Sequence, residues 1–286
     1  MPRIAFVNGS FVPHSRAAVH VEDRGYQFAD GVYEVIFVRD SRMLDAGRHL
    51  DRLERSLALL AIPMPCHRRA LEQISERLRR QNLLRNGLVY IQVTRGVTTR
   101  DHAPPPEVLA AMQPALVMTT KRLPLPDEAA IAKGVAVISL PDERWHRCEI
   151  KTVNLLPNVL AKMQARDAGA YEAWLIDRDG FVTEGTASNA WIVTQDKQII
   201  THQRGVEILS GVTRAAVLDW LGDGWQFAER KFSRAEALAA AEAFLTSASS
   251  FVTPVVSIDG KPIGNGKPGE VATELRRRYL AQVAGS

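Results

Sequence analysis

The 286-residue sequence is poor in cysteine and has no long hydrophobic run. Its two cysteines, Cys66 and Cys148, show no paired spacing and no nearby set of histidine ligands, which argues against structural zinc and against a disulfide framework. The longest apolar stretches have the length of a strand, so no membrane span is expected. The first residues lack the apolar segment of a secretion signal. These absences predict a cytoplasmic protein with reduced thiols.

A large excess of charge of one sign is also absent, since the formal net charge is only +4. Apolar residues make up 46% and charged residues 24%, which is the composition of a globular protein. The basic residues form short clusters at 67–69, 77–80 and 276–278. Each cluster lies in a helical stretch with Glu and Leu, without interleaved aromatic residues, which indicates solvated helix faces. A nucleic-acid partner is therefore not expected.

The common hydrolase and nucleotide-binding motifs are missing as well. The sequence contains no GxSxG, no GxxxxGK[ST] and no HExxH. The glycine-rich segment 264–269 resembles a phosphate loop, but its spacing does not fit that motif and Pro268 has no N–H to donate. We interpret this segment as a connector to the last helix.

The pattern of apolar and turn-forming residues predicts strands and helices mixed along the whole chain. Leu50, Leu53, Leu57 and Leu60, for example, have the spacing of one helix face. The predicted helices cover residues 48–60, 67–84, 154–168, 213–221, 234–243 and 270–283. The predicted strands cover 3–8, 31–38, 88–95, 114–120, 134–140, 173–177 and 190–194, with a β-rich stretch at 244–258. The turn at Asp179-Gly180 is expected to let residues 190–194 pair with residues 173–177.

A proline-rich segment divides the chain. Residues 123–127 (LPLPD) contain two prolines, which prevent regular strand pairing and are typical of a linker. We therefore predict a mixed α/β (α+β) fold of two domains, one at residues 1–122 and the other at 123–286.

Several polar segments after the linker could carry chemistry. Lys151 lies among apolar and small polar residues, a setting that can turn a lysine into a nucleophilic amine. Glu184 is followed by glycine and small polar residues, as in a tight loop that enters a strand. Residues 210–214 (SGVTR) open a predicted helix, where free N–H groups favour an anion, and residues 246–250 form a second hydroxyl-rich turn. Taken singly, these features are more often an exposed lysine, an ordinary turn and a plain helix N-cap.

Taken in order, these segments resemble the signature of class IV pyridoxal-phosphate enzymes. The matching pieces are Lys151, the EGxxxNA segment from Glu184 to Ala190, Thr201, and the LxGVTR segment that ends at Arg214. The family includes D-amino-acid transaminases, branched-chain aminotransferases and aminodeoxychorismate lyases. Residues 24–34 (RGYQFADGVYE) and 94–102 (TRGVTTRDH) are most similar to the D-amino-acid transaminases, and the resemblance covers nearly the whole chain.

The resemblance implies a role for individual residues. Lys151 would hold pyridoxal 5'-phosphate as a Schiff base, and the Glu184 carboxylate would face the pyridine nitrogen of this cofactor. The C-terminal domain would bind the cofactor, whose phosphate contacts would come from Arg52, Val212, Thr213, Ser247 and Ala248. Ala248 departs from the family pattern because the D-transaminases tend to have a hydroxyl there, which Ser247 or Ser249 would replace. Trp191 stands where the family usually has Phe or Tyr.

The N-terminal domain would bind the substrate. Tyr33, Arg100 and His102 would bind the α-carboxylate, with the loop of Arg100 and His102 reaching in from the neighbouring subunit of a homodimer. The implied reaction is transamination of D-amino acids to 2-oxo acids, with 2-oxoglutarate or pyruvate as acceptor and Lys151 moving the Cα proton. The alternatives are a branched-chain L-aminotransferase or (R)-amine transaminase, an aminodeoxychorismate lyase, and a basic nucleic-acid-binding protein. The Arg-x-His loop argues against the first two.

Overall fold

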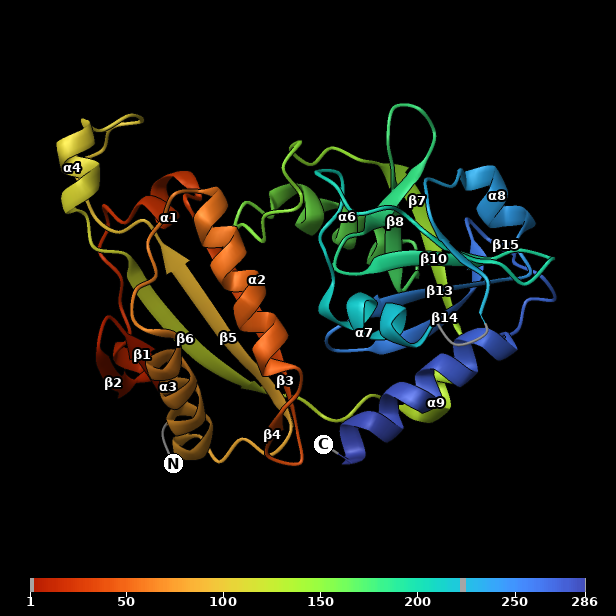
Figure 1. The fold of residues 1–286 in the computed structure, drawn as a ribbon, viewed down its shortest axis with the longest axis horizontal. Coiled ribbons are helices and arrows are strands. Elements are labelled where there is room, and N and C mark those ends of the chain that lie inside the picture. The colour runs from red at the N-terminus through yellow and green to blue at the C-terminus, as the bar shows by residue number, and fades with distance from the viewer. Residues whose placement is uncertain (1–2, 222–224, 286) are drawn as a thin grey trace. The chain divides into compact units, whose positions relative to one another are not determined.

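The structure, a computed structural model, describes residues 3–221 and 225–285. The chain divides into two compact units (Figure 1). The first contains Met1–Leu125 and Ile150–Asn154, and the second contains Pro126–Glu149 and Leu155–Ser286. The change from the first unit to the second at Leu125 falls inside the proline-rich segment at 123–127.

The described part of the first unit contains an antiparallel six-stranded sheet in the order β2-β1-β6-β5-β3-β4. Its strands are β1 (Ile4–Val7), β2 (Ser10–Pro13), β3 (Gly31–Arg39), β4 (Arg42–Met43), β5 (Gly87–Thr94) and β6 (Ala115–Arg122). The helices are η1 (His14–Arg16), α1 (Arg24–Phe28), α2 (Ala46–Leu59), α3 (Arg68–Gln81) and α4 (Pro106–Ala111). Leu50, Leu53 and Leu57 of α2 are buried, which agrees with the predicted helix face, and α2 packs along β3.

The segment that carries Lys151 returns to this first sheet. The N–H of Tyr33 donates to the carbonyl of Lys151 (2.9 Å), and the N–H of Val153 donates to the carbonyl of Gly31 (3.1 Å). Val32 and Thr152 form an isolated antiparallel bridge. Residues 150–154 thus extend the sheet at the free edge of β3, which explains why they belong to the first unit. The two predicted domains did not include this return, because hydrogen bonds to a distant strand edge leave no local pattern in the sequence.

The described part of the second unit contains a mixed nine-stranded sheet in the order β12-β11-β10-β13-β14-β7-β8-β9, in which β15 pairs with β14. Its strands are β7 (Val135–Pro141), β8 (Glu172–Ile176), β9 (Val182–Gly185), β10 (Asn189–Val193), β11 (Ile199–Thr201), β12 (Phe227–Glu229), β13 (Glu242–Ser247), β14 (Phe251–Ile258) and β15 (Lys261–Pro262). The helices are α5 (Glu128–Ile131), α6 (Leu156–Asp167), α7 (Val212–Trp220), α8 (Arg234–Ala239) and α9 (Glu270–Gly285). None of the described helices has the length and apolarity needed to cross a bilayer.

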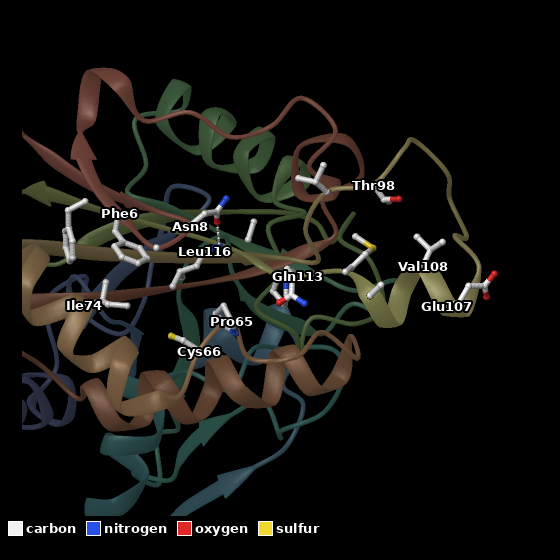
Figure 2. A pocket seen from close by; sticks show the side chains of 17 residues that line it. Phe6, Asn8, Pro65, Cys66, Ile74, Thr98, Glu107, Val108, Gln113 and Leu116 are labelled. Atoms are coloured by element: carbon white, nitrogen blue, oxygen red, sulfur yellow. Dashed lines mark hydrogen bonds between the residues drawn. The ribbon is translucent and has the colours of Figure 1, made fainter.

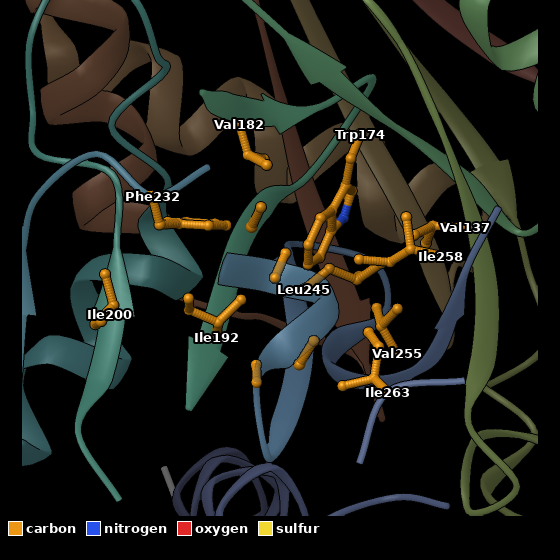
Figure 3. Packing of buried hydrophobic residues seen from close by; sticks show 14 residues of the cluster. Val137, Trp174, Val182, Ile192, Ile200, Phe232, Leu245, Val255, Ile258 and Ile263 are labelled. Carbon is orange, nitrogen blue, oxygen red and sulfur yellow. The ribbon is translucent and has the colours of Figure 1, made fainter. Parts of the chain in front are cut away.

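Two buried clusters support this sheet. In the first, Trp174 and Phe232 meet edge to face with ring centroids 6.3 Å apart, among the aliphatic side chains of β10, β13 and β14 (Figure 3). In the second, Trp191 stacks on Phe244 at 5.3 Å and packs with residues of α7 and α9. The clusters support β9, which carries Glu184, and β10, which follows it in the chain.

The predicted pairing of residues 190–194 with 173–177 is wrong. The hairpin at Asp179-Gly180 leads instead into β9, which pairs with β8, while β10 pairs with β11 and β13. β9 was not predicted because its sequence, Val-Thr-Glu-Gly, has the composition of a turn, although all four residues are buried. A strand buried at these positions must satisfy its polar side chains inside the protein.

Candidate active site

The amine of Lys151 lies beside the side chain of Tyr33. Its Nζ donates to the Tyr33 hydroxyl at 3.2 Å and lies 4.2 Å from the centroid of that ring. The Lys151 N–H donates to Ser56 Oγ of α2, so the backbone of this residue is held on both sides. In residues 3–221 and 225–285, no carboxylate forms an ion pair with Lys151. An amine held in place but not neutralised by a carboxylate is suited to react with a carbonyl.

Arg52 lies one helical turn before Ser56 on α2 and is buried with a carboxylate. Its Nε donates to Glu34 Oε1 at 2.6 Å and its Nη2 to Oε2 at 2.9 Å, and His49 Nδ1 lies 2.7 Å from the same Oε2. Glu34 is fully buried because it shares the inward face of β3 with Val32 and Ile36. Burial raises the pKa of Glu34, but the Arg52 charge and the hydrogen bonds from His49 and Arg52 outweigh it and lower the pKa to about 2.

Replacing Glu34 by glutamine is expected to destabilise the protein by about 3 kcal/mol or more, because it leaves the buried Arg52 without its charge partner. The pKa of Glu34 is about 2 in the folded chain and 4.5 without these interactions. This carboxylate therefore stabilises the fold fully above pH 4.5, and the contribution is lost as the pH falls toward 2. Urea titrations of parent and variant across this range measure the difference.

The matched control is Glu76→Gln. Glu76 also has a pKa of about 2, from hydrogen bonds donated by Arg79 and Arg80, but its side chain is partly exposed, whereas that of Glu34 is fully buried. We expect this change to cost about 1 kcal/mol or less at neutral pH. Equal losses for Glu34→Gln and Glu76→Gln would contradict the structural role of the buried pair.

In the second unit, the Glu184 carboxylate is surrounded by donors. It accepts hydrogen bonds from an Nη of Arg144, from the Leu209 N–H at 3.1 Å and from Asn189 Nδ2 at 2.9 Å. Arg144 in turn donates to Asp142 from Nε (2.9 Å) and Nη2 (2.7 Å). Each oxygen of Glu184 is thus fixed in direction by several elements of one unit.

The two carboxylates that share Arg144 differ in their electrostatics. Complete burial raises the pKa of Glu184, and the charge and hydrogen bonds of Arg144 oppose this rise without cancelling it. Burial also raises the pKa of Asp142, but the hydrogen bonds and the charge of Arg144 outweigh this effect and lower the pKa. A buried carboxylate with a raised pKa is a strong acceptor for a protonated ring nitrogen.

The start of α7 has the features of an anion site. Gly211 is the N-cap and provides no side chain for the free N–H groups of the first turn, which includes Val212 and Thr213. A side chain at Gly211 would collide with Asn189, so the cap approaches β10 closely. The hydroxyl of Thr213 is buried and has no hydrogen-bond partner within the described residues. A buried hydroxyl without a partner beside free N–H groups fits a phosphate.

The second hydroxyl-rich turn follows β13, whose Thr246 lies opposite Asn189 in the β10–β13 pairing. The Ser247 hydroxyl is 2.7 Å from the Ser250 hydroxyl and accepts the Ser250 N–H, so it is engaged within the turn. Ser249 is exposed and makes no side-chain hydrogen bond in the described chain. Of the two hydroxyls expected to replace the missing one at Ala248, that of Ser249 is the one without a partner.

Trp191, where the sequence departs from the family pattern, is fully buried behind this region. Its indole N–H donates to Thr246 Oγ1 at 3.0 Å, and its ring stacks on Phe244. The larger ring is therefore accommodated with its polar atom satisfied.

The loop of Arg100 and His102 also belongs to the first unit. Arg100 and His102 both contact Phe28: the guanidinium carbon lies 5.1 Å from the ring centroid, and the two ring centroids are 5.1 Å apart. In the described residues, neither side chain hydrogen-bonds to Tyr33 or Lys151. Of the three side chains expected at the substrate carboxylate, Tyr33 is the one that hydrogen-bonds to Lys151 within the described residues.

A cavity of about 1140 Å³ in the first unit is not formed by the predicted residues (Figure 2). Its walls come from β1, β2, the start of β6, the residues around Cys66 and the segment around α4, and include Phe6, Phe11, Val108, Met112 and Leu116. The lining is mainly apolar, and Cys66 and Glu107 are its titratable side chains. The candidate site residues are instead assigned within each unit by itself, from the polar contacts of Lys151 in the first and of Glu184 in the second.

The sequence analysis missed the residues that support the candidate site through long-range contacts: Arg24, Glu34, His49, Asp142 and Arg144. One signal was available for Glu34, since a charged residue on the inward face of an apolar strand needs a buried partner. No comparable signal existed for Arg144, which contacts Glu184 across 40 residues.

Comparisons with known proteins identify the family of this chain. The model of the family described as Amino-transferase class IV matches residues 31–258. A D-alanine aminotransferase of Bacillus licheniformis is 40% identical over 282 residues, covering 97% of each chain. One from Listeria monocytogenes (strain 10403S) is 35% identical, covering 97% of this chain and 95% of the relative. The T.th. branched-chain amino acid aminotransferase, complexed with N-(5'-phosphopyridoxyl)-L-glutamate, has a TM-score of 0.87 at 27% identity, covering 100% of this chain and 95% of that one. The chain belongs to the class IV aminotransferase family.

Proposed function

We propose that this protein uses pyridoxal 5'-phosphate to transaminate D-amino acids to 2-oxo acids, with 2-oxoglutarate or pyruvate as acceptor. The observation that carries the substrate class is the 40% identity, over 97% of both chains, to a protein named D-alanine aminotransferase. The similarity to the branched-chain enzyme is lower, at 27% identity. A branched-chain L-aminotransferase activity is the alternative that this structural likeness favours.

The residues of the site fit the cofactor. Lys151 provides the amine for covalent attachment, and Glu184 provides a buried acceptor for the ring nitrogen. The phosphate would be bound by the first N–H groups of α7, the Thr213 hydroxyl and the turn at 247–249, with Ser249 as the hydroxyl beside Ala248. Arg52 would add the positive charge of its guanidinium, whose Nε and Nη2 donate to Glu34. When bound, the cofactor supplies the electron sink that lets the substrate Cα–H bond break.

The protein contributes proton transfer and charge control. Lys151 Nζ takes the proton from the substrate Cα, and the Tyr33 hydroxyl, 3.2 Å away, holds this amine in position. Glu184 is kept in one orientation by Arg144, Asn189 and Leu209, so no reorganisation is needed when charge develops near it.

Arg100 and His102 are proposed to bind the substrate α-carboxylate together with Tyr33. Because they do not contact Tyr33 in the described chain, the proposal has them act in the site of the neighbouring subunit, which makes the enzyme a homodimer. A cytoplasmic location completes the proposal and rests on the two free thiols.

A panel of donor amino acids tests the proposed substrate class. With 2-oxoglutarate as acceptor, D-alanine and D-glutamate are expected to be good donors and their L-isomers much poorer ones. L-leucine and L-valine distinguish the branched-chain alternative, and an (R)-amine distinguishes the amine transaminase. Faster turnover of L-leucine or L-valine than of D-alanine would overturn the D-specific assignment.

Arg100→Ala is expected to raise the KM for D-alanine about tenfold or more, because it removes the charged partner of the substrate carboxylate. Arg69→Ala is the matched control, since it removes an exposed arginine of α3 and changes the net charge equally. Steady-state kinetics of both variants measure the effect. Unchanged D-alanine kinetics in Arg100→Ala would show that this loop does not bind the carboxylate.

A further inference from the structure

The loop that carries Arg100 and His102 is exposed, yet its backbone is tied to one buried side chain. Arg24 of α1 donates from Nη1 to the Asp101 carbonyl at 2.5 Å and from Nη2 to the His102 carbonyl at 3.4 Å. Asp101 and His102 themselves are exposed, whereas only 6% of Arg24 is accessible. A buried guanidinium is thus directed at the backbone between the two residues proposed to bind the carboxylate.

Arg24 is itself held in place from two sides. Its Nε donates to Asp30 Oδ2 at 2.8 Å, and its guanidinium carbon lies 4.9 Å from the centroid of the Phe28 ring. Phe28 is the ring that Arg100 and His102 also contact. One aromatic ring therefore supports the anchoring arginine and both loop side chains, which favours a single loop conformation.

The helix that presents Arg24 is fixed to the start of the same loop. The Arg24 N–H donates to the Gly96 carbonyl at 2.9 Å, and Asp23 bridges to Val97. Asp23 also caps α1 by accepting the Gly25 N–H and receives the Thr94 hydroxyl at 2.8 Å. The loop is therefore joined to α1 at its base through backbone contacts and near its tip through the Arg24 side chain.

We propose that Arg24 is a positioning residue for substrate binding: by holding the carbonyls of Asp101 and His102, it orders the loop so that Arg100 and His102 are presented together to the substrate carboxylate. The proposal rests on the proposed function for the identity of the bound group. A loop that is ordered before the substrate arrives loses no conformational entropy on binding. Loss of the anchor therefore weakens substrate binding rather than proton transfer. Only a guanidinium offers three donors in a plane to Asp30 and two carbonyls, which a lysine ammonium cannot reproduce.

Arg95 provides a matched control. Like Arg24, it pairs with Asp30, donating from Nε (2.8 Å) and Nη2 (3.0 Å), but its other bonds go to the Leu60 and Ala61 carbonyls. It makes no side-chain contact with residues 100–102 in the described structure. Burial raises the pKa of Asp30, and hydrogen bonds from Arg95 and Arg24 reverse this and lower it, so Asp30 keeps one partner in either single variant.

The experiment compares Arg24→Met, Arg24→Lys and Arg95→Met with the parent holoenzyme. Amide hydrogen exchange is measured over residues 99–103, and KM and kcat are measured with D-alanine. In Arg24→Met we expect exchange of these amides to accelerate by about tenfold and KM to rise by about tenfold, with kcat within about twofold of the parent. Arg24→Lys should show smaller changes of the same kind, and Arg95→Met should leave both quantities near the parent values.

The outcomes separate this inference from the proposed function. Unchanged exchange in Arg24→Met overturns the anchor, and faster exchange with unchanged KM overturns its role in binding. Equal effects in Arg95→Met and Arg24→Met also overturn it, because they would trace the effect to Asp30. If D-alanine is not a donor for the parent enzyme, the proposed function fails. The rate of amide hydrogen exchange over residues 99–103 then decides by itself whether Arg24 orders the loop.

Discussion

Replacing Lys151 by alanine is expected to reduce the transamination rate by at least about a thousandfold, because it removes the proposed attachment point of the cofactor and the proposed base for the Cα proton. The visible absorbance of lysine-bound cofactor should be lost as well. In the described structure the Lys151 amine contacts Tyr33 and no carboxylate. Its Nζ is therefore available for covalent chemistry in a way that an ion-paired lysine is not.

Lys162 is the control for this prediction. Its Nζ donates to the Tyr171 carbonyl and lies 3.4 Å from Glu172 Oε1, so its charge is already paired. Lys162→Ala is expected to keep most of the activity. Borohydride reduction of the holoenzyme followed by peptide mapping gives an independent readout, with the label expected on Lys151. A label on Lys162, or a fully active Lys151→Ala variant, would contradict the assignment.

Glu184→Gln is expected to lower kcat by about tenfold to a hundredfold, the scale of one lost charge-assisted hydrogen bond. Cofactor affinity should change less, because the residues proposed to bind the phosphate do not include Glu184. The glutamine can still accept the Leu209 N–H, and Arg144 keeps its two bonds to Asp142, so the fold should tolerate the change. Kinetics of proton abstraction and fluorescence titration with the cofactor separate the two effects.

Asp259→Asn is a suitable comparison for Glu184→Gln. Asp259 is also an arginine-paired carboxylate of the second unit, bonded to Arg234 and Ser139, but it makes no contact with Glu184 in the described residues. A kcat near the parent value is expected for this variant. If Glu184→Gln also turned over at the parent rate, the carboxylate would have no part in the electron sink.

The elements with a strong local pattern could be predicted from the sequence. The leucine spacing located α2, and an amphipathic pattern located α3, although α3 ends at Gln81 rather than near residue 84. The family, the mixed fold and the pyridoxal-phosphate cofactor are confirmed by the comparisons. They could be predicted because the motif from Lys151 to Arg214 combines residue types in a fixed order. The roles of individual site residues stay predictions that the variants above test.

The contacts that support the site could not be predicted in the same way. The pairs Glu34–Arg52 and Arg144–Glu184 each join two elements brought together only by folding. The return of Lys151 to the edge of β3 depends on backbone hydrogen bonds, which any residue except proline can donate. The turn-like composition of β9 hid a buried strand for a related reason, since burial depends on the neighbouring strands and not on the residues alone.

The central claim, that this chain is a D-amino-acid transaminase, is tested most directly by a single half-reaction with the two enantiomers of alanine. The pyridoxal form of the enzyme is mixed with D-alanine or L-alanine in the absence of any 2-oxo acid, and the pyruvate released per active site is measured. Our account predicts stoichiometric pyruvate from D-alanine and a far slower release from L-alanine. Equal or faster release from L-alanine would contradict the account.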